Sequence, residues 1–141
     1  MSPEYEIVAR VADATELHRL AAAVGWLHHY DWPTVAAALE GSLHGAVALH
    51  EGQVVGAARL VGDGVHYFYV QDVLVDPAHS DEGIGSALVA HLLEWVSATV
   101  PADAFVGLFS SPEARGMYAD LGFTQPDDMT GMTVTIPAGT G

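Results

Sequence analysis

A long run of β-branched and aromatic residues, VHYFYVQDVLVDP at positions 65–77, is the feature that most limits how this chain can fold. Side chains of these types favour extended backbone. Because apolar residues fill the run almost continuously, it predicts a strand that is buried on both faces rather than one with a polar side. The chain is therefore expected to fold around a central strand, which ends at Pro77.

The residues after this run have the pattern of a helix followed by a second buried strand. Apolar residues recur at helical spacing within 83–96, and 104–109 is typical of a buried strand. A crossover helix between two strands predicts one parallel pair. The other expected elements are strands at 5–11, 45–50, 53–61 and 131–136, and helices at 13–24, at 31–41 and from residue 112. We expect an α/β fold, with a mixed, mostly antiparallel central sheet, one parallel pair, and helices on both faces.

Composition limits the class of protein. The 141 residues, 50% apolar and 16% charged, predict a single globular domain over residues 1–141. The absence of cysteine excludes disulfides, thiolate metal ligands and a cysteine nucleophile. The N-terminus lacks the pattern of a secretory signal, and no apolar run reaches the roughly 18 residues of a membrane span, so we expect a cytoplasmic protein.

The charge balance limits the partners. Asp and Glu number 18 against four arginines and no lysine, which gives a net charge of −14. Nucleic acids need a basic surface, so this balance argues against a nucleic-acid partner. It favours cationic small molecules. The alternative is that the acidity serves only solubility or a salty habitat.

The sequence HSDEGIGSAL, at 79–88, lies where the predicted central strand gives way to the helix. Gly83 and Gly85 let backbone N–H groups approach an anion such as a phosphate. Asp81 and Glu82 oppose an anion, but several main-chain donors outweigh two carboxylates that face water. The alternative is an ordinary helix start, in which Ser80 is the N-cap and the two acids favour the helix dipole.

Three motifs together, VLVDP, GIGSAL and MYADLGF, resemble the GNAT superfamily of acetyl-CoA-dependent N-acetyltransferases. Within it, DVLVDP, LFSSPEARGMYADLGF and the closing GM are most similar to the small aralkylamine, or serotonin-type, N-acetyltransferases. The family's cofactor loop reads Arg or Gln, two residues, Gly, one residue, then Gly or Ala. Here that frame is SDEGIG at 80–85, so Ser80 replaces the basic or amide residue.

The resemblance implies acetyl-CoA as co-substrate and also implies which residues contact it. The pantetheine arm would pair with the backbone of Val73, Leu74 and Val75 as an added strand does, and a backbone N–H there would polarise the thioester carbonyl. The remaining implied contacts are Ser80, Asp81, Glu82, Gly83, Ile84, Gly85 and Ser86 in the loop, and Ser111 and Arg115 later in the chain. For Arg115, pairing with a surface acid is the alternative.

Two residues are candidates for proton transfer. Tyr118 matches the family's tyrosine in MYADLGF, which implies a general acid that protonates the departing thiolate. The alternative is a packed ring with a locally bonded hydroxyl. Asp72, in the middle of VQDVLV, is the candidate base, acting directly or through a water, because a carboxylate in a dry strand is costly without a use. The alternative is that Asp72 pairs with Arg59.

The connection GWLHHYDW, at 25–32, lies where the resembled family closes over its acceptor. The resemblance implies that Trp26, Tyr30 and Trp32 line or cover the acceptor pocket, and an ordinary aromatic corner is the alternative. His66 would share a face with Asp72 if no bulge intervenes, and is then a candidate for substrate contact and for the base in place of Asp72. A histidine at a strand end is the alternative for His66.

A metal site is not predicted. His28 and His29 are adjacent on a loop near Asp31, but no clear third ligand follows at helical spacing. We therefore expect no metal ion at this connection, and the proton-transfer residues above carry the expected chemistry.

The expected function is the transfer of an acetyl group to a primary amine of a small molecule, with aralkyl amines ahead of polyamines. One alternative is a catalytically silent GNAT-fold module that binds an acyl-CoA or a protein partner. This alternative stays open because Ser80 replaces the Arg or Gln of the family's cofactor loop. Another is acetylation of a protein N-terminus or lysine. A homodimer is also open, because dimers are common in this superfamily.

Overall fold

The computed structural model describes residues 4–139, which form two compact units, one ending at Leu108 and the other beginning at Phe109. The elements of the first unit are β1 (Tyr5–Val8), α1 (Ala14–Val24), the 3-10 helix η1 (Leu27–His29), α2 (Trp32–Glu40), β2 (His44–His50), β3 (Gln53–Gly62), β4 (Tyr67–Val75), the 3-10 helix η2 (Pro77–His79), α3 (Ile84–Thr99) and β5 (Phe105–Gly107). The second unit contains the 3-10 helix η3 (Pro112–Ala114) and α4 (Arg115–Asp120).

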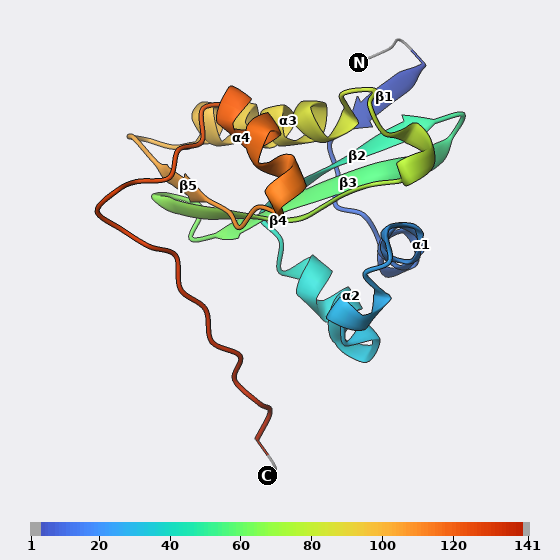
Figure 1. Ribbon diagram of the computed structural model, residues 1–141, viewed down its shortest axis with the longest axis horizontal. Coiled ribbons are helices and arrows are strands. Elements are labelled where there is room, and N and C mark those ends of the chain that lie inside the picture. The colour runs from blue at the N-terminus through green and yellow to red at the C-terminus, as the bar shows by residue number, and fades with distance from the viewer. Residues whose placement is uncertain (1–3, 140–141) are drawn as a thin grey trace. The chain divides into compact units, whose positions relative to one another are not determined.

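The first unit is built on a five-stranded sheet with the order β1-β2-β3-β4-β5. All neighbouring strands are antiparallel except β4 and β5, which are parallel. Helix α3 lies along one face of the sheet, and α1 and α2 lie along the other (Figure 1). The expected mixed sheet with one parallel pair and helices on both faces is therefore confirmed.

Each face of the sheet has its own hydrophobic core. On the α3 side, Ile84, Leu88 and Leu92 pack against small and β-branched residues of the strands. On the other side, Leu17 and Leu20 of α1 pack with residues of α2 and of the same strands. The apolar stripe at helical spacing within 83–96 thus has the buried role that its pattern predicts.

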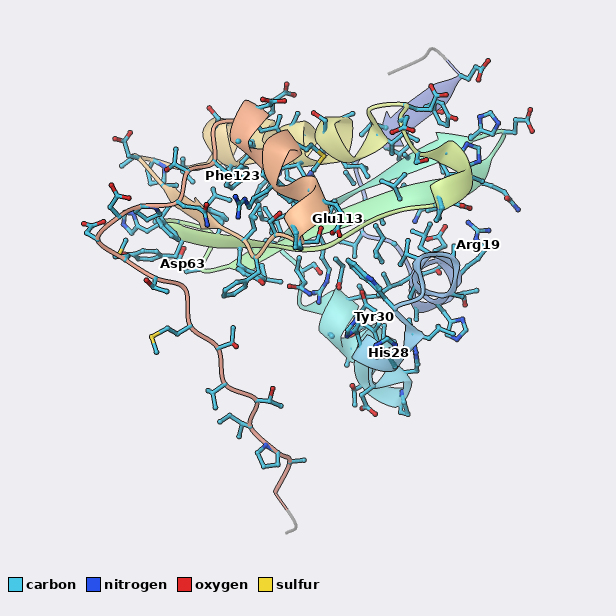
Figure 2. The ribbon with its side chains drawn as sticks, viewed as in Figure 1. Arg19, His28, Tyr30, Asp63, Glu113 and Phe123 are labelled. Carbon is cyan, nitrogen blue, oxygen red and sulfur yellow. The ribbon has the colours of Figure 1, made fainter. Side chains whose placement is uncertain are left out.

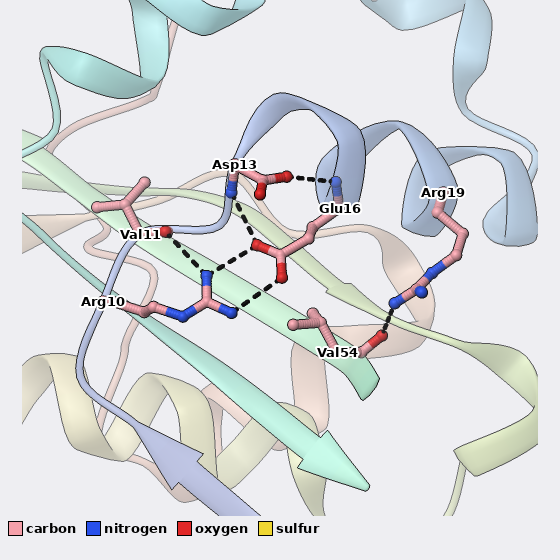
Figure 3. A network of polar contacts seen from close by, with 6 residues as sticks. All are labelled: Arg10, Val11, Asp13, Glu16, Arg19 and Val54. Atoms are coloured by element: carbon pink, nitrogen blue, oxygen red, sulfur yellow. Dashed lines mark hydrogen bonds and ion pairs between the residues drawn. The ribbon is translucent and has the colours of Figure 1, made fainter. Parts of the chain in front are cut away.

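The start of α1 follows from the local sequence DATE. The Asp13 carboxylate accepts a hydrogen bond from the Glu16 N–H at 2.8 Å, and the Glu16 carboxylate accepts one from the Asp13 N–H at 3.0 Å (Figure 3). This reciprocal pair is a capping box. Arg10 donates to both oxygens of Glu16, and Arg19 donates to the Val54 carbonyl, which ties α1 to β3 (Figure 3).

Strand β4 contains a β-bulge at Asp72. Opposite β3, the partners change from Ala57 with Leu74 to Arg59 with Gln71, so β4 holds one extra residue in this interval. Asp72 takes up the extra residue with a φ of 55°, in the left-handed region that non-glycine residues seldom adopt. Leu74, two residues after Asp72, packs in the core on the side of α1 and α2.

The bulge reverses which side chains face each core. Before it, Phe68 and Val70 pack on the α3 side, and after it Val73 and Val75 take that side. An even spacing along β4 therefore does not keep two residues on one face. The shared face expected for His66 and Asp72 required that no bulge intervene, and that condition is not met.

The second unit differs from the expectation for the chain's end. Residues 124–139 contain neither helix nor strand, so the strand predicted at 131–136 is wrong. Met132, Val134 and Ile136 do alternate with polar residues, yet they are 88%, 80% and 77% exposed. Alternation predicts a strand only where a neighbouring backbone supplies hydrogen bonds, and in the described residues none pairs with this segment.

No helix within residues 4–139 combines the length and the apolar character that crossing a membrane requires.

A glycine at position 56 sets how closely α3 approaches the sheet. A Cβ atom there would lie 2.9 Å from Ile84 Cγ2 and 3.1 Å from Leu88 Cδ1, closer than packed carbon atoms approach. We expect Gly56→Ala to lower the free energy of unfolding by about 1–3 kcal/mol, because α3 must shift to admit the methyl group. Denaturant unfolding measures this change.

The matched control is Gly41→Ala, whose added Cβ would have a single ordinary contact of 3.4 Å with the Ala38 carbonyl oxygen. A Gly56→Ala protein as stable as the Gly41→Ala protein would contradict the close packing of α3 on β3.

Candidate active site

The loop between η2 and α3 leaves the first main-chain donors of α3 without a side-chain cap. Gly83 is the N-cap residue, in the left-handed conformation at φ 77°, and it offers no side chain. The first hydrogen bond within the helix runs from the Ala87 N–H to the Gly83 carbonyl at 3.0 Å. The N–H groups of Ile84, Gly85 and Ser86 precede that bond, so they point out of the helix end as an anion site requires.

Ser80 does not cap this helix. Its N–H donates to the Pro77 carbonyl at 3.2 Å, so Ser80 ends η2 instead. Asp81, like Gly83, has a left-handed backbone, at φ 65°. Asp81 and Glu82 are both exposed. Of the two interpretations of HSDEGIGSAL, the ordinary capped helix start with Ser80 as N-cap is therefore not what the structure contains.

The edge of β4 beside this loop has a long stretch without a neighbouring strand. Strand β5 pairs only with Tyr67, Phe68 and Tyr69. In the described part of the chain, the edge of β4 from Val70 to Val75 that faces away from β3 has no strand beside it. Its backbone groups are thus available to a ligand that adds to the sheet as a strand does. Val73, Leu74 and Val75, the implied pantetheine contacts, lie on this stretch.

The Asp72 carboxylate is held by three donors and is only 5% exposed. Its Oδ2 accepts from Arg59 Nε at 2.7 Å, and its Oδ1 accepts from the Tyr30 hydroxyl at 2.8 Å and from Gln71 Nε2 at 3.1 Å. The guanidinium of Arg59 also donates to the Ala38 carbonyl and to Ser42 Oγ, each at 3.2 Å. We call Asp72, Arg59, Tyr30 and Gln71 the Asp72 network.

The pairing of Asp72 with Arg59, weighed as an alternative from the sequence, is therefore present. A cavity of about 10 Å³ borders both residues on the side of α1 and α2, which is about the space of one water molecule. A base role of Asp72, direct or through a water, stays a prediction.

Tyr30 reaches Asp72 from the connection between α1 and α2. We call residues 26–32 the acceptor corner. Within it, the rings of Tyr30 and Trp32 lie 4.9 Å apart, and Trp32 Nε1 donates to the Leu27 carbonyl at 3.1 Å. Figure 2 shows Tyr30 and His28 on this side of the sheet, near α2. Burial and the neighbouring Asp72 raise the pKa of Tyr30 well above its usual value, so its hydroxyl keeps its proton at neutral pH.

Trp26 is 37% exposed, and its ring packs edge-on against His29 at 5.8 Å. The rings of His28 and His29 lie 4.2 Å apart and are tilted by 37°. Within residues 4–139, no group of three or more His, Asp or Glu side chains is placed to hold a metal ion. In the acceptor corner the ring of Trp26 is thus exposed, whereas Tyr30 and Trp32 are half-buried against the core and Tyr30 anchors the corner to β4.

His66 lies before the first residue of β4, at the opposite end of the strand from Val75. It is exposed, its N–H donates to Asp63 Oδ1 at 2.8 Å, and its carbonyl accepts from Phe105 N–H at 2.8 Å. Six residues of strand separate it from Asp72, which is about 20 Å. The structure does not bring His66 to the acceptor corner, and the alternative of a histidine at a strand end fits its position.

Tyr118 belongs to the second unit. It is 7% exposed, and its ring packs edge-on against Phe123 at 5.8 Å. Arg115 is exposed at the start of the same helix, and Ser111 is the N-cap of η3. A spacing of three residues places Arg115 and Tyr118 as neighbours on α4. Their roles, and that of Ser111, stay predictions.

A cavity of about 370 Å³ lies elsewhere in the first unit. It is lined by the C-terminal half of α3, residues 100–104 and Val106. The loop between η2 and α3 lies at the other end of α3, so this cavity does not belong to the candidate active site.

The Acetyltransferase (GNAT) family model matches residues 11–123. A serotonin N-acetyltransferase 2 from Oryza sativa subsp. japonica, described as chloroplastic, is 30% identical over 125 residues, which cover 85% of this chain and 61% of that protein. A histone acetyltransferase from Glycine max is 28% identical over 132 residues, with 85% and 56% covered. The curated relatives that match are longer, and the chain spans between 31% and 65% of their lengths.

Among solved structures, a GNAT-family acetyltransferase from Streptococcus pneumoniae TIGR4 is 29% identical, with a TM-score of 0.77 over 95% of this chain and 99% of that one. The family model covers more than half of the chain. The fold, the loop SDEGIG at 80–85 and the open edge of β4 agree with this family. These findings show that the chain belongs to the GNAT family of acetyltransferases.

Proposed function

We propose that this protein transfers the acetyl group of acetyl-CoA to the primary amine of a small molecule. The observation that carries the proposal is the open edge of β4 from Val70 to Val75, which leads to the uncapped start of α3. An extended pantetheine arm fits the first feature, and a pyrophosphate fits the second. The residues present therefore suit this co-substrate, although Ser80 supplies no positive charge.

In the proposed reaction the neutral amine attacks the thioester carbonyl, so that an N–C bond forms and the C–S bond breaks. The ammonium form must first lose a proton, which Asp72 would accept through a water. The departing thiolate would take the proton of the Tyr118 hydroxyl, and the surplus proton that the attacking nitrogen loses would return through water to the Tyr118 oxygen, which leaves a neutral amide and a thiol. A backbone N–H of β4 would stabilise the negative charge on the carbonyl oxygen.

For the acceptor we propose aralkyl amines ahead of polyamines. The rings of Trp26, Tyr30 and Trp32 at the acceptor corner offer an aromatic surface, and the net charge of −14 attracts cations. The rice relative's name, serotonin N-acetyltransferase, agrees with this order. We also propose a cytoplasmic location and keep a homodimer open.

The test combines calorimetry with an acetylation assay. We expect acetyl-CoA to bind and tryptamine to be acetylated faster than spermidine. No acetyl-CoA binding at low millimolar concentration would defeat the proposal. Binding without acetylation of a broad amine panel would favour the silent module instead.

A protein acceptor is the second candidate, since the Glycine max relative is named a histone acetyltransferase. A panel of lysine-containing and N-terminal peptides, assayed beside the small amines, separates the two. Faster acetylation of peptides than of every small amine would favour the protein acceptor.

The acidic loop gives a prediction about cofactor affinity. We expect the double variant Asp81→Gly and Glu82→Lys to bind acetyl-CoA several-fold more tightly, because it removes two exposed negative charges next to the first turn of α3. Glycine also accepts the left-handed backbone of position 81. Calorimetry at low and high salt measures the effect, which added salt should reduce.

The control is Glu40→Lys, which makes a similar change of charge at the exposed end of α2. If the loop variant binds no more tightly than this control, the carboxylates of the loop do not act on the phosphates.

A further inference from the structure

Tyr30 joins two parts of the candidate active site that come from distant parts of the sequence. Its hydroxyl donates to Asp72 Oδ1 at 2.8 Å across 42 positions. Tyr30 is the residue that follows η1, in the acceptor corner, and Asp72 is the bulge residue of β4. Figure 2 places Tyr30 in the layer of α1 and α2 that covers one face of the sheet.

The bulge needs to be held in place. Asp72 has a left-handed backbone at φ 55°, a conformation that persists in a residue other than glycine only where the surroundings enforce it. Arg59 of β3 fixes Oδ2 of its carboxylate, with Nε at 2.7 Å. Tyr30 and Gln71 fix Oδ1, and of these two only Tyr30 comes from outside β4.

The bulge lies within the open stretch of β4, directly before Val73, Leu74 and Val75. A displacement of Asp72 would therefore move the proposed acetyl-CoA edge, and a displacement of Tyr30 would move the aromatic rings of the acceptor corner. The hydrogen bond joins these two surfaces directly, beside the packing of α1 and α2 on the sheet, and both surfaces must be held in place to bring an amine to a thioester.

We propose that Tyr30 is a positioning residue for acetyl transfer, whose hydrogen bond to Asp72 holds the acceptor corner at the bulge of β4. The role rests on the proposed function. Tyr30 is not assigned a proton-transfer step, since the neighbouring carboxylate and burial keep its hydroxyl protonated. Its ring contact with Trp32 transmits the same restraint to the rest of the corner.

Tyr30→Phe is the direct test, because it removes the hydroxyl and keeps the ring. We expect the KM for tryptamine to rise about tenfold, the change that loss of a hydrogen bond to a charged group gives. The KM for acetyl-CoA should stay within about twofold, since the edge of β4 keeps Arg59 as a partner of Asp72. Tyr67→Phe, which removes the hydroxyl of a 65% exposed tyrosine, is the matched control and should behave as the unmodified protein.

The same bond has a spectroscopic signature that does not depend on activity. Tyrosine ionisation, followed by ultraviolet absorption between pH 9 and pH 12, should show one fewer delayed tyrosine in Tyr30→Phe than in the unmodified protein, in which Tyr5 also has a raised pKa. In Asp72→Leu, Tyr30 should move back toward ordinary titration, because the change removes the charge that disfavours the phenolate.

These measurements separate the possible failures. An unchanged KM for tryptamine in an active Tyr30→Phe enzyme, or an equal rise of both KM values, would overturn the positioning role. Titration of Tyr30 together with the exposed tyrosines would overturn the hydrogen bond on which it depends. An inactive unmodified protein that still shows the delayed titration of Tyr30 would refute the proposed function, and the positioning role with it, while the bond stands.

Discussion

Asp72→Ala should lower the free energy of unfolding by about 3–5 kcal/mol, because it leaves the Arg59 guanidinium without its buried partner. The Arg59 side chain is 16% exposed and that of Asp72 is 5% exposed, so water does little to replace the lost interaction. The change also removes the acceptor of the Tyr30 hydroxyl. Guanidinium chloride unfolding, followed by far-ultraviolet circular dichroism, measures the loss.

A double variant separates the charge from the packing. Asp72→Leu combined with Arg59→Met removes both members of the ion pair, and we expect it to recover at least part of the stability that Asp72→Ala loses. The exposed pair of Arg10 and Glu16 gives the scale for a surface interaction, about 0–1 kcal/mol. An Asp72→Ala protein within that smaller range of the unmodified protein would show that the pair is not buried in solution.

The rate distinguishes a base from an anchor at the same position. Asp72→Asn keeps the size of the side chain but cannot take a proton at neutral pH. If Asp72 is the base, the rate falls and its dependence on pH changes shape. A slower enzyme with an unaltered pH profile would leave Asp72 with the structural part alone.

Tyr118→Phe should lower kcat by about 100-fold or more, because the thiolate would leave without a proton donor. The affinity for acetyl-CoA should change little, since the ring remains and keeps its contact with Phe123. Steady-state rates with tryptamine and calorimetry with acetyl-CoA measure the two quantities separately.

Tyr67→Phe again provides the matched control for loss of an exposed hydroxyl. Thermal unfolding of Tyr118→Phe shows whether α4 still folds. A kcat within about twofold of the unmodified value would remove Tyr118 as the acid and leave the packed ring as its role.

Local sequence signals predicted much of this fold. The capping box at Asp13 and Glu16 gave the start of α1, and the apolar stripe in 83–96 gave α3 with its buried face. Both signals act within a few residues, so they can be recognised without tertiary information. The run at 65–77 likewise became β4, between β3 and the parallel β5.

What the sequence did not predict depends on tertiary contacts. The bulge at Asp72 arises where β4 meets β3, and a bulge leaves no clear mark in a run of apolar residues. The hydrogen bond of Tyr30 to Asp72 joins positions 42 apart, so neither residue indicates the other. The alternation at 131–136 predicted a strand, but alternation does not supply a partner backbone.

The open edge of β4 has a consequence for mutational scanning. If backbone groups bind a coenzyme there, side-chain truncation at Val73 or Val75 removes none of these hydrogen bonds, because every truncated residue keeps its amide. A scan that replaces one side chain at a time would then report this stretch as unimportant for binding, although its backbone would hold the coenzyme. Only a backbone change, such as an ester in place of one amide, would expose what the strand contributes.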